Sequence, residues 1–188
     1  MKLSCLILGD FLFGETLYED YLGFLKNHFE IYYNCDLKFP DLIIGWGSGC
    51  FTLLENINKL NDKVLMLISP YLDFDMFFKW IYNDNNWRKK YLFLSGIDNE
   101  RYLKVDIDYS FLLGKKLFLS EMNLYNNKTY IIYGNENKLV PIEYGLKLGL
   151  LLNGTSFHLI EDAGFSPFYD KCDEFRKIVE EFVINENF

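Results

Sequence analysis

Short, almost wholly apolar segments alternate along this chain with stretches whose apolar residues follow helical spacing. A strand that is apolar throughout is buried on both faces, and helices between strands supply the crossovers that parallel pairing needs. The alternation therefore predicts an α/β fold, with a mostly parallel sheet of about six strands and helices on both faces. The apolar segments cover residues 3–9, 30–34, 42–45, 64–69, 129–134 and 156–160, and the helical spacing covers residues 16–27, 51–60, 141–152 and 173–183.

The segment 71–127 interrupts this alternation. It is rich in aromatic residues, among them Tyr71, Trp80 and Phe93, and it shows no clear repeat of strand and helix. We interpret it as a cap inserted over the site, and an irregular part of the same core is the alternative. A length of 188 residues supports one sizeable core but is short for two. We therefore predict a single domain over residues 1–188.

Composition excludes several kinds of partner. A net charge of −8 argues against nucleic acid, because neutralising phosphates requires clustered Lys and Arg. The apolar run near the N-terminus is too short for a signal peptide, and no other segment is long and apolar enough to span a bilayer. These features predict a cytoplasmic protein without a membrane partner. The cysteines at positions 5, 35, 50 and 172 have no paired spacing, so we expect free thiols and neither a disulfide nor a metal or other cofactor.

The most informative turn lies at residues 45–49, which read Gly-Trp-Gly-Ser-Gly between an apolar strand and a helix. This turn resembles the nucleophile elbow Gly-x-Ser-x-Gly of α/β-hydrolases, where small residues flank the nucleophile because the turn is tight. Gly45 and Gly49 match the two glycines, and the nucleophile position falls on Gly47. A plain glycine-rich turn that binds an anion through the N–H groups of a helix N-terminus is the alternative.

Two later segments extend the resemblance. Residues 133–141 read Tyr-Gly-Asn-Glu-Asn-Lys-Leu-Val-Pro and are similar to the loop that carries the acid, with Asn137 at the acid position. Residues 164–168 read Gly-Phe-Ser-Pro-Phe and are similar to the loop that carries the histidine, with Phe165 in its place. Within the α/β-hydrolase superfamily, these features and Trp46 look closest to the pimeloyl-[acyl-carrier protein] methyl ester esterases of biotin synthesis.

That resemblance has implications for the pocket and its ligands. It implies an oxyanion and pocket lining of Gly9, Asp10, Phe11 and Trp46, although Leu-Gly-Asp-Phe at residues 8–11 replaces the His-Gly segment of the family. It also implies a small acyl ester, or an acidic acyl carrier protein, as ligand or partner. The basic run at residues 87–90, Trp-Arg-Lys-Lys, could meet such a carrier, and a solvated loop is the alternative. The oligomeric state is not indicated.

The residues at the three triad positions lack the chemistry of a serine hydrolase. Gly47 supplies no nucleophile, Asn137 carries no charge to stabilise an imidazolium, and Phe165 accepts no proton. Loss of triad members reduces turnover by roughly 10⁴ to 10⁶ where it has been measured. We therefore favour a catalytically degenerate hydrolase homologue that acts by binding an acyl ligand or a protein partner.

The alternative is an active carboxylic ester hydrolase. A turn shifted by one residue would make Ser48 the nucleophile, with Glu136 as the acid and His158 as the base. The only other histidine in the sequence is His28. Cys50 is a further candidate nucleophile, but it also lacks an evident base. This alternative requires an imidazole within hydrogen-bond reach of the attacking group.

Overall fold

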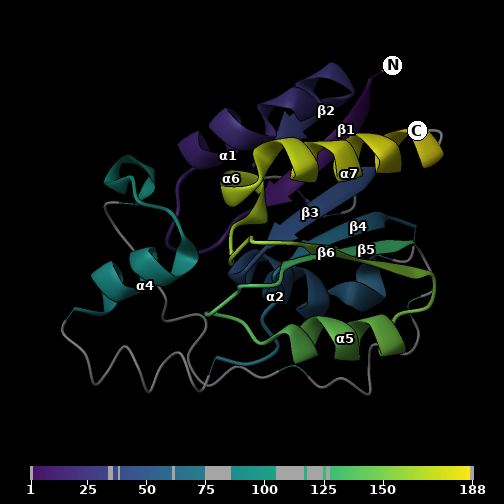
Figure 1. The fold of residues 1–188 in the computed structure, drawn as a ribbon. Coiled ribbons are helices and arrows are strands. Elements are labelled where there is room, and N and C mark those ends of the chain that lie inside the picture. The colour runs from purple at the N-terminus through teal and green to yellow at the C-terminus, as the bar shows by residue number, and fades with distance from the viewer. Residues whose placement is uncertain are drawn as a thin grey trace.

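Six parallel strands form one sheet at the centre of the computed structural model (Figure 1). The structure describes residues 2–33, 36–37, 39–60, 62–74, 86–104, 117, 125 and 128–186. The strand order is β2-β1-β3-β4-β5-β6, and every neighbouring pair is parallel. The predicted sheet and its strand number are confirmed. The strands are β1 (Leu3–Leu8), β2 (Phe29–Tyr32), β3 (Leu42–Trp46), β4 (Val64–Ile68), β5 (Thr129–Gly134) and β6 (Thr155–Ile160).

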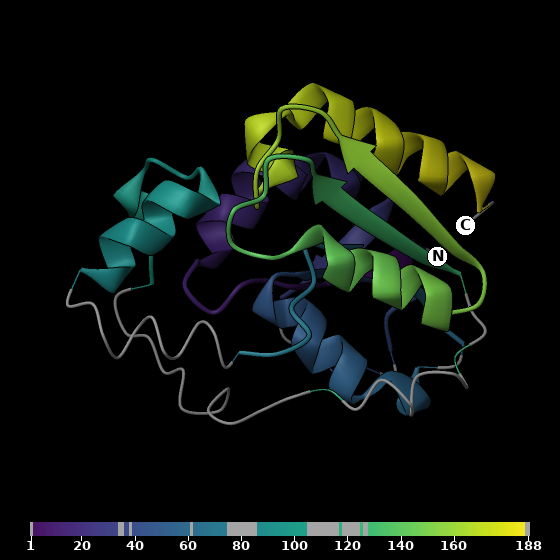
Figure 2. The same ribbon diagram turned by 60° about the horizontal axis from the view of Figure 1, so that its bottom comes forward.

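Helices cover both faces of the sheet, as predicted. In both views α1 (Glu15–Leu22), α6 (Pro167–Asp170) and α7 (Cys172–Asn185) lie on one face, and α2 (Ser48–Glu55) and α5 (Ile142–Leu151) lie on the other (Figures 1 and 2). Central strands are therefore covered from both sides, and all five residues of β3 are buried. Short 3-10 turns follow α1 at Gly23–Asn27 and α2 at Ile57–Lys59.

Helix α7 shows how the sequence pattern produces this packing. Phe175, Val179 and Phe182 are spaced three or four residues apart and are all buried, so they form one apolar stripe. Tyr130 of β5 packs against Phe182, with the ring centroids 4.3 Å apart. Within the described residues, no helix has both the length and the apolar character needed to cross a membrane.

The direction in which successive strands are added to the sheet reverses at β1. The chain leaves β1 through α1 to reach β2 at one edge, and it then returns to the other side of β1 as β3, followed by α2 on the opposite face. The loops after β1 and β3 therefore diverge, and the carboxyl ends of these two strands border a crevice. In open parallel sheets, ligands bind at such a switch point.

The described part of the expected cap lies beyond the carboxyl ends of the strands (Figure 2). It contains α4 (Trp87–Ser95) and a 3-10 turn, η3 (Glu100–Tyr102). The chain just after η3 is joined to the β1–α1 loop, because the N–H of Lys104 donates to the carbonyl of Leu12 at 3.0 Å. The rest of segment 71–127, which we interpret as a cap from the sequence, lies outside the described residues. It comprises residues 75–85, 105–116, 118–124 and 126–127.

Candidate functional site

The turn between β3 and α2 has its tip at Gly47. Its φ of +55° and ψ of −117° lie in a region of backbone conformation that residues other than glycine rarely adopt. The Gly47 N–H donates to the carbonyl of Ile68 at 3.0 Å, and its carbonyl accepts from the N–H of Cys50 at 3.2 Å. Ser48 is the first residue of α2. The turn therefore presents Gly47 where a nucleophile elbow presents its nucleophile, with Ser48 one position beyond.

The flanking glycine Gly49 allows the turn to approach β1 closely. A Cβ atom on Gly49 would lie 1.9 Å from the carbonyl oxygen of Leu8. At Gly45, a Cβ atom would lie 2.9 Å from Cα of Cys50. Neither position has room for a side chain. The start of α2 therefore lies directly against the carboxyl end of β1, where the oxyanion donors of a hydrolase would be expected.

The Asp10 carboxylate lies directly above the tip of the turn. Its Oδ2 is 2.4 Å from the position of a Cβ on Gly47, and it accepts from the N–H of Ser48 at 3.0 Å. Its Oδ1 accepts from the N–H of Leu12 at 3.2 Å, and the Tyr91 hydroxyl of α4 donates to the carboxylate. The backbone donor that would stabilise an oxyanion is thus already bound to an internal carboxylate.

Asp10 is fully buried, and this burial raises its pKa from 3.8 to about 6. Hydrogen bonds from the backbone N–H groups of Ser48 and Leu12 act in the opposite direction, because they stabilise the charged form. At neutral pH the group remains mainly ionised. A negative charge therefore stands at the point where an ester carbonyl would develop negative charge during attack.

The Ser48 side chain faces the loop after β1. Its hydroxyl oxygen accepts from the N–H of Phe11 at 2.7 Å, and the residue is 2% exposed. Cys50, the other candidate nucleophile, is buried in the first turn of α2, and its thiol donates to the carbonyl of Ile68 at 3.4 Å. Burial raises the pKa of Cys50 well above its usual value, so the thiolate is disfavoured.

The positions 47, 137 and 165 converge on one point. The Phe165 ring reaches to within 2.7 Å of a Cβ built on Gly47. The Phe165 carbonyl accepts from the hydroxyl of Ser69 at 3.0 Å, and this hydroxyl accepts from Nδ2 of Asn137 at 3.0 Å. Asn137 also stabilises its own loop, since its Oδ1 accepts from the N–H groups of Leu139 and Val140.

Aromatic side chains fill the volume above the turn. The Trp46 ring lies 5.0 Å from the Phe165 ring between centroids, and its indole N–H donates to the Phe165 carbonyl at 3.0 Å. Tyr91 packs from α4 against both Phe11 and Phe165, at 5.8 and 6.0 Å. All four residues are at most 5% exposed. The space that would hold the scissile ester is occupied by the protein's own side chains.

The two histidines lie away from Ser48. His158 is central in β6, and β5 and β4 lie between that strand and β3. The His158 ring stacks on Tyr130 at 6.1 Å, its Nε2 has no hydrogen-bond partner among the described residues, and burial lowers its pKa. His28 is exposed and precedes β2, at the opposite edge of the sheet. The Glu136 side chain is exposed. The structure therefore does not assemble Ser48, Glu136 and His158 into a triad.

A pocket of about 300 Å³ opens beside the turn, at the switch point. Gly9 and Phe11 line it, together with Ser48 and Gly49 at the start of α2 and Tyr18 on α1. Asp10 and Trp46 do not line it. The expected lining is therefore divided between a filled volume above Gly47 and an open pocket next to it. Within the described ranges, no three His, Cys, Asp or Glu side chains come together as a metal site.

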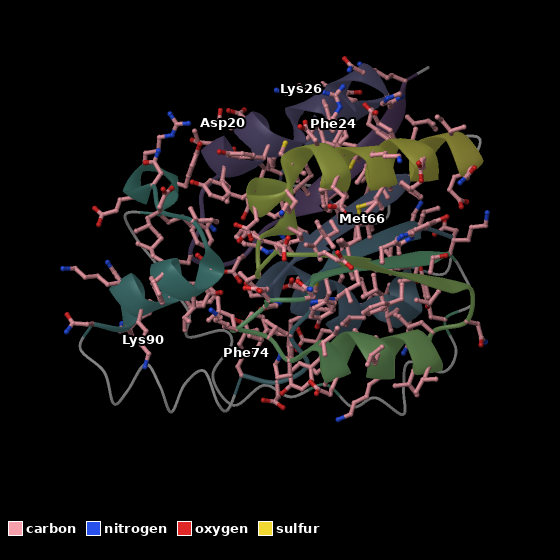
Figure 3. The ribbon with its side chains drawn as sticks, viewed as in Figure 1. Asp20, Phe24, Lys26, Met66, Phe74 and Lys90 are labelled. Atoms are coloured by element: carbon pink, nitrogen blue, oxygen red, sulfur yellow. The ribbon has the colours of Figure 1, made fainter. Side chains whose placement is uncertain are left out.

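Segment 86–104 is hydrogen-bonded to α1. Asp20 of α1 accepts from Nη2 of Arg101 at 2.5 Å and from the hydroxyl of Tyr102 at 2.8 Å. The Ser166 hydroxyl, at the start of α6, donates to the carbonyl of Ser95 at 2.8 Å. Figure 3 labels Asp20 on α1 and Lys90 on α4. Segment 86–104 is thus attached to two different parts of the body of the molecule.

Sequence reasoning did not identify Ser69, Tyr18 or Tyr91. Ser69 ends a predicted strand, and its φ of +48° is unusual for a residue other than glycine, but nothing in the sequence indicates that conformation. Tyr18 lies in an amphipathic helix, where a tyrosine is ordinarily read as core. Tyr91 lies in a segment for which no element was predicted. Their roles come from contacts between distant parts of the chain.

Solved structures share this fold. Carboxylesterase CesB (YbfK) from Bacillus subtilis has a TM-score of 0.72 at 11% identity, over 97% of this chain and 84% of that one. A thermophilic esterase from Thermogutta terrifontis has a TM-score of 0.71 at 10% identity, over 98% and 90%. MGS-MChE2, an α/β hydrolase from a lagoon-sediment metagenome, has a TM-score of 0.65 at 14% identity, over 100% and 93%. No family model matches the chain. The predicted α/β-hydrolase fold is confirmed.

Proposed function

We propose that this chain is a catalytically degenerate homologue of the α/β-hydrolases and that it binds an acyl ligand or an acyl-bearing protein without cleaving it. One observation carries the proposal. The carboxylate of Asp10 and the ring of Phe165 fill the space above Gly47, at 2.4 and 2.7 Å from a Cβ at that position. A serine hydrolase needs its nucleophile and the substrate carbonyl in that space.

Three physical arguments support loss of the reaction. Gly47 carries no attacking group, and neither histidine lies near Ser48 to accept its proton. The Ser48 N–H that would stabilise an oxyanion already donates to Asp10. A developing alkoxide beside that carboxylate would be repelled in a buried site, where electrostatic interactions are strong. Electrostatic stabilisation of the transition state is usually the largest contribution to such catalysis. In this site the Asp10 carboxylate would instead destabilise that transition state.

The nearer relation that we propose is to the pimeloyl-carrier-protein methyl ester esterases of biotin synthesis. It rests on the order and spacing of the elbow, the Asn137 loop and the Phe165 loop. The partner that this relation implies is an acidic acyl carrier protein. In support, Arg88, Lys89 and Lys90 are exposed on α4 of an acidic chain, and Phe93 on the same helix is 80% exposed. Basic and apolar groups side by side suit an acidic partner that carries an acyl chain.

The direct test is chemical. The protein and its Ser48→Ala variant are incubated with a fluorophosphonate probe and with short-chain nitrophenyl esters. We expect no labelling by the probe, and ester turnover no faster than with the Ser48→Ala variant. A known serine esterase serves as the positive control. Labelling or turnover that disappears in the Ser48→Ala variant would establish the active hydrolase instead.

A further inference from the structure

The outer edge of β6 has no partner strand in the part of the chain that the structure describes. β6 is the last strand of the sheet and lies between α5 and α7 (Figure 2). The carbonyls of Gly154 and Ile160 accept from N–H groups at the two ends of β5, at 3.4 and 3.1 Å. Backbone groups alternate in direction along a strand, so those of Thr155, Phe157 and Leu159 point away from the sheet.

This strand lacks the features that usually protect an edge. Natural edge strands are blocked by charged side chains, by proline or by a β-bulge. Residues 155–160 read Thr-Ser-Phe-His-Leu-Ile, without Asp, Glu, Lys, Arg or Pro, and their register with β5 is regular over all six positions. Burial lowers the pKa of His158, so this side chain is neutral at pH 7. The edge is therefore open to pairing with another strand.

Exposed leucines border this edge on its α5 side. Leu146 and Leu150, about one turn apart on α5, are 49% and 88% exposed, and Leu159 of β6 is 46% exposed. The opposite side of α5 points toward β4, because the hydroxyl of Tyr144 donates to Asp73, just after β4, at 2.9 Å. Leu146 and Leu150 therefore point toward the outer edge of β6.

The side chain of Leu159 lies on the same side of the sheet. Phe157 faces α5, since its ring is 2.9 Å from the position of a Cβ on Gly145, and residues two apart in a strand share a face. Leu146, Leu150 and Leu159 thus form one exposed apolar surface, the leucine patch. An apolar patch beside an open strand edge is typical of an interaction surface.

The geometry of this edge is complementary to itself. In an antiparallel pair of β6 strands with a two-fold axis at Phe157, the outward groups of Phe157 meet those of the same residue in the second copy. The outward groups of Thr155 meet those of Leu159. The same axis places the two α5 helices side by side, so that each leucine patch covers the other.

The α7 side of the edge is compatible with this pairing. Glu181 lies near β6, because its charge acts on His158, and it forms an exposed ion pair with Lys177. Both charges are present on this side, so it is electrostatically self-complementary. This matters because two copies with a net charge of −8 each repel one another wherever one sign prevails.

We infer that two copies of this chain dimerise through β6, with their sheets joined edge to edge and the leucine patches buried between the two α5 helices. This inference goes beyond the proposed function and does not depend on it. The open pocket lies at β1 and β3, away from β6, and α4 lies beyond the carboxyl ends of the strands. The dimer therefore leaves the pocket and α4 of each copy accessible.

Sedimentation equilibrium of the full chain, from about 1 to about 100 µM, tests the dimer. Leu150→Lys and Leu159→Lys each place a charge in the leucine patch. Ile184→Lys is the matched control, because Ile184 is 71% exposed and lies two residues after the buried Phe182, on the opposite side of α7. We expect the original chain and the control to dimerise equally. Each patch variant should weaken the dimer about tenfold or more, since both copies lose a buried leucine.

Amide hydrogen exchange tests the strand pairing itself. The N–H groups of Phe157 and Leu159 are free in a monomer and hydrogen-bonded in the dimer. Their exchange should therefore slow as the concentration of the original chain rises, and it should stay fast in the patch variants.

Three results would overturn the inference. A chain that sediments as a monomer at every concentration would leave the edge to another occupant, such as an extended segment of a different protein. A dimer that tolerates both patch changes would use another surface. A dimer in which the amides of Phe157 and Leu159 still exchange fast would not pair through β6. Circular dichroism shows whether each variant is folded, and the second patch variant decides if the first is not.

Discussion

At the scale of single residues, Gly47 is subject to two constraints at once. Its φ of +55° disfavours a side chain, and Asp10 and Phe165 occupy the space that a side chain would need. The same residue explains the missing nucleophile and the filled site, because a serine at the tip and the present packing exclude each other.

This exclusion predicts the outcome of restoring the expected serine. Gly47→Ser should lower the free energy of unfolding by about 3 kcal/mol or more, through backbone strain and overpacking, and should create no esterase activity. Gly23→Ser is the matched control, since φ there is −59° and no atom lies within 4 Å of an added Cβ. Its stability should stay within about 0.5 kcal/mol of the original chain. Denaturant unfolding measures both. A Gly47→Ser protein of unchanged stability would show that the site opens readily.

Asp10 gives a second prediction, on pH. Its pKa is about 6 when folded and 3.8 as a reference, so the folded chain holds this proton more tightly than the unfolded chain. Stability from this group is therefore greatest at low pH and is lost as pH rises through the window between these values. Relative to Asp10→Asn, the original chain should lose about 2 to 3 kcal/mol between about pH 4 and about pH 8. Unfolding curves measured across this range test it. Parallel pH profiles for the two proteins would contradict it.

At the scale of elements, Asp20 of α1 binds the segment 86–104 through its side chain. This carboxylate accepts from Arg101 and Tyr102, and Tyr102 also stacks edge to face on Tyr21 at 6.1 Å. The ion pair is partly exposed, so its removal should cost little global stability. The anchoring nevertheless determines how often segment 86–104 detaches from the body of the molecule.

Asp20→Ala should therefore increase amide hydrogen exchange in residues 86–104 severalfold, while the melting temperature falls by no more than about 4 °C. Glu180→Ala, which removes an exposed ion pair with Arg176 on α7, is the control and should leave that exchange unchanged. Exchange followed by mass spectrometry gives the comparison. Unchanged protection in Asp20→Ala would mean that the other contacts of the segment hold it, namely the packing of Tyr91 and the hydrogen bonds of Lys104 to Leu12 and of Ser166 to Ser95.

At the scale of the whole molecule, the distribution of charge should determine how the chain binds the proposed acyl carrier protein. The chain has a net charge of −8, and Arg88, Lys89 and Lys90 are consecutive exposed cations on α4. Reversing all three to Glu should weaken binding of an octanoylated acyl carrier protein by about tenfold at low salt, mainly through slower association. Lys177→Glu, exposed on α7, is the control and should have little effect. Surface plasmon resonance at low and high salt decides this. Equal binding by the triple variant would remove the carrier from the proposal.

The sequence by itself determined the sheet, the helices on both faces and the turn at residues 45–49. These features depend on local periodicity, on glycine and on the burial of continuous apolar strands, all of which can be read within a few residues. Only the tertiary structure decided what fills the site. The bond between Asp10 and Ser48 joins residues 38 positions apart, and the link from Ser69 to Phe165 spans 96. The position of Tyr18 in the wall of the pocket likewise depends on how α1 packs against β1. Such contacts arise from the close packing of distant segments, and local sequence pattern does not encode them.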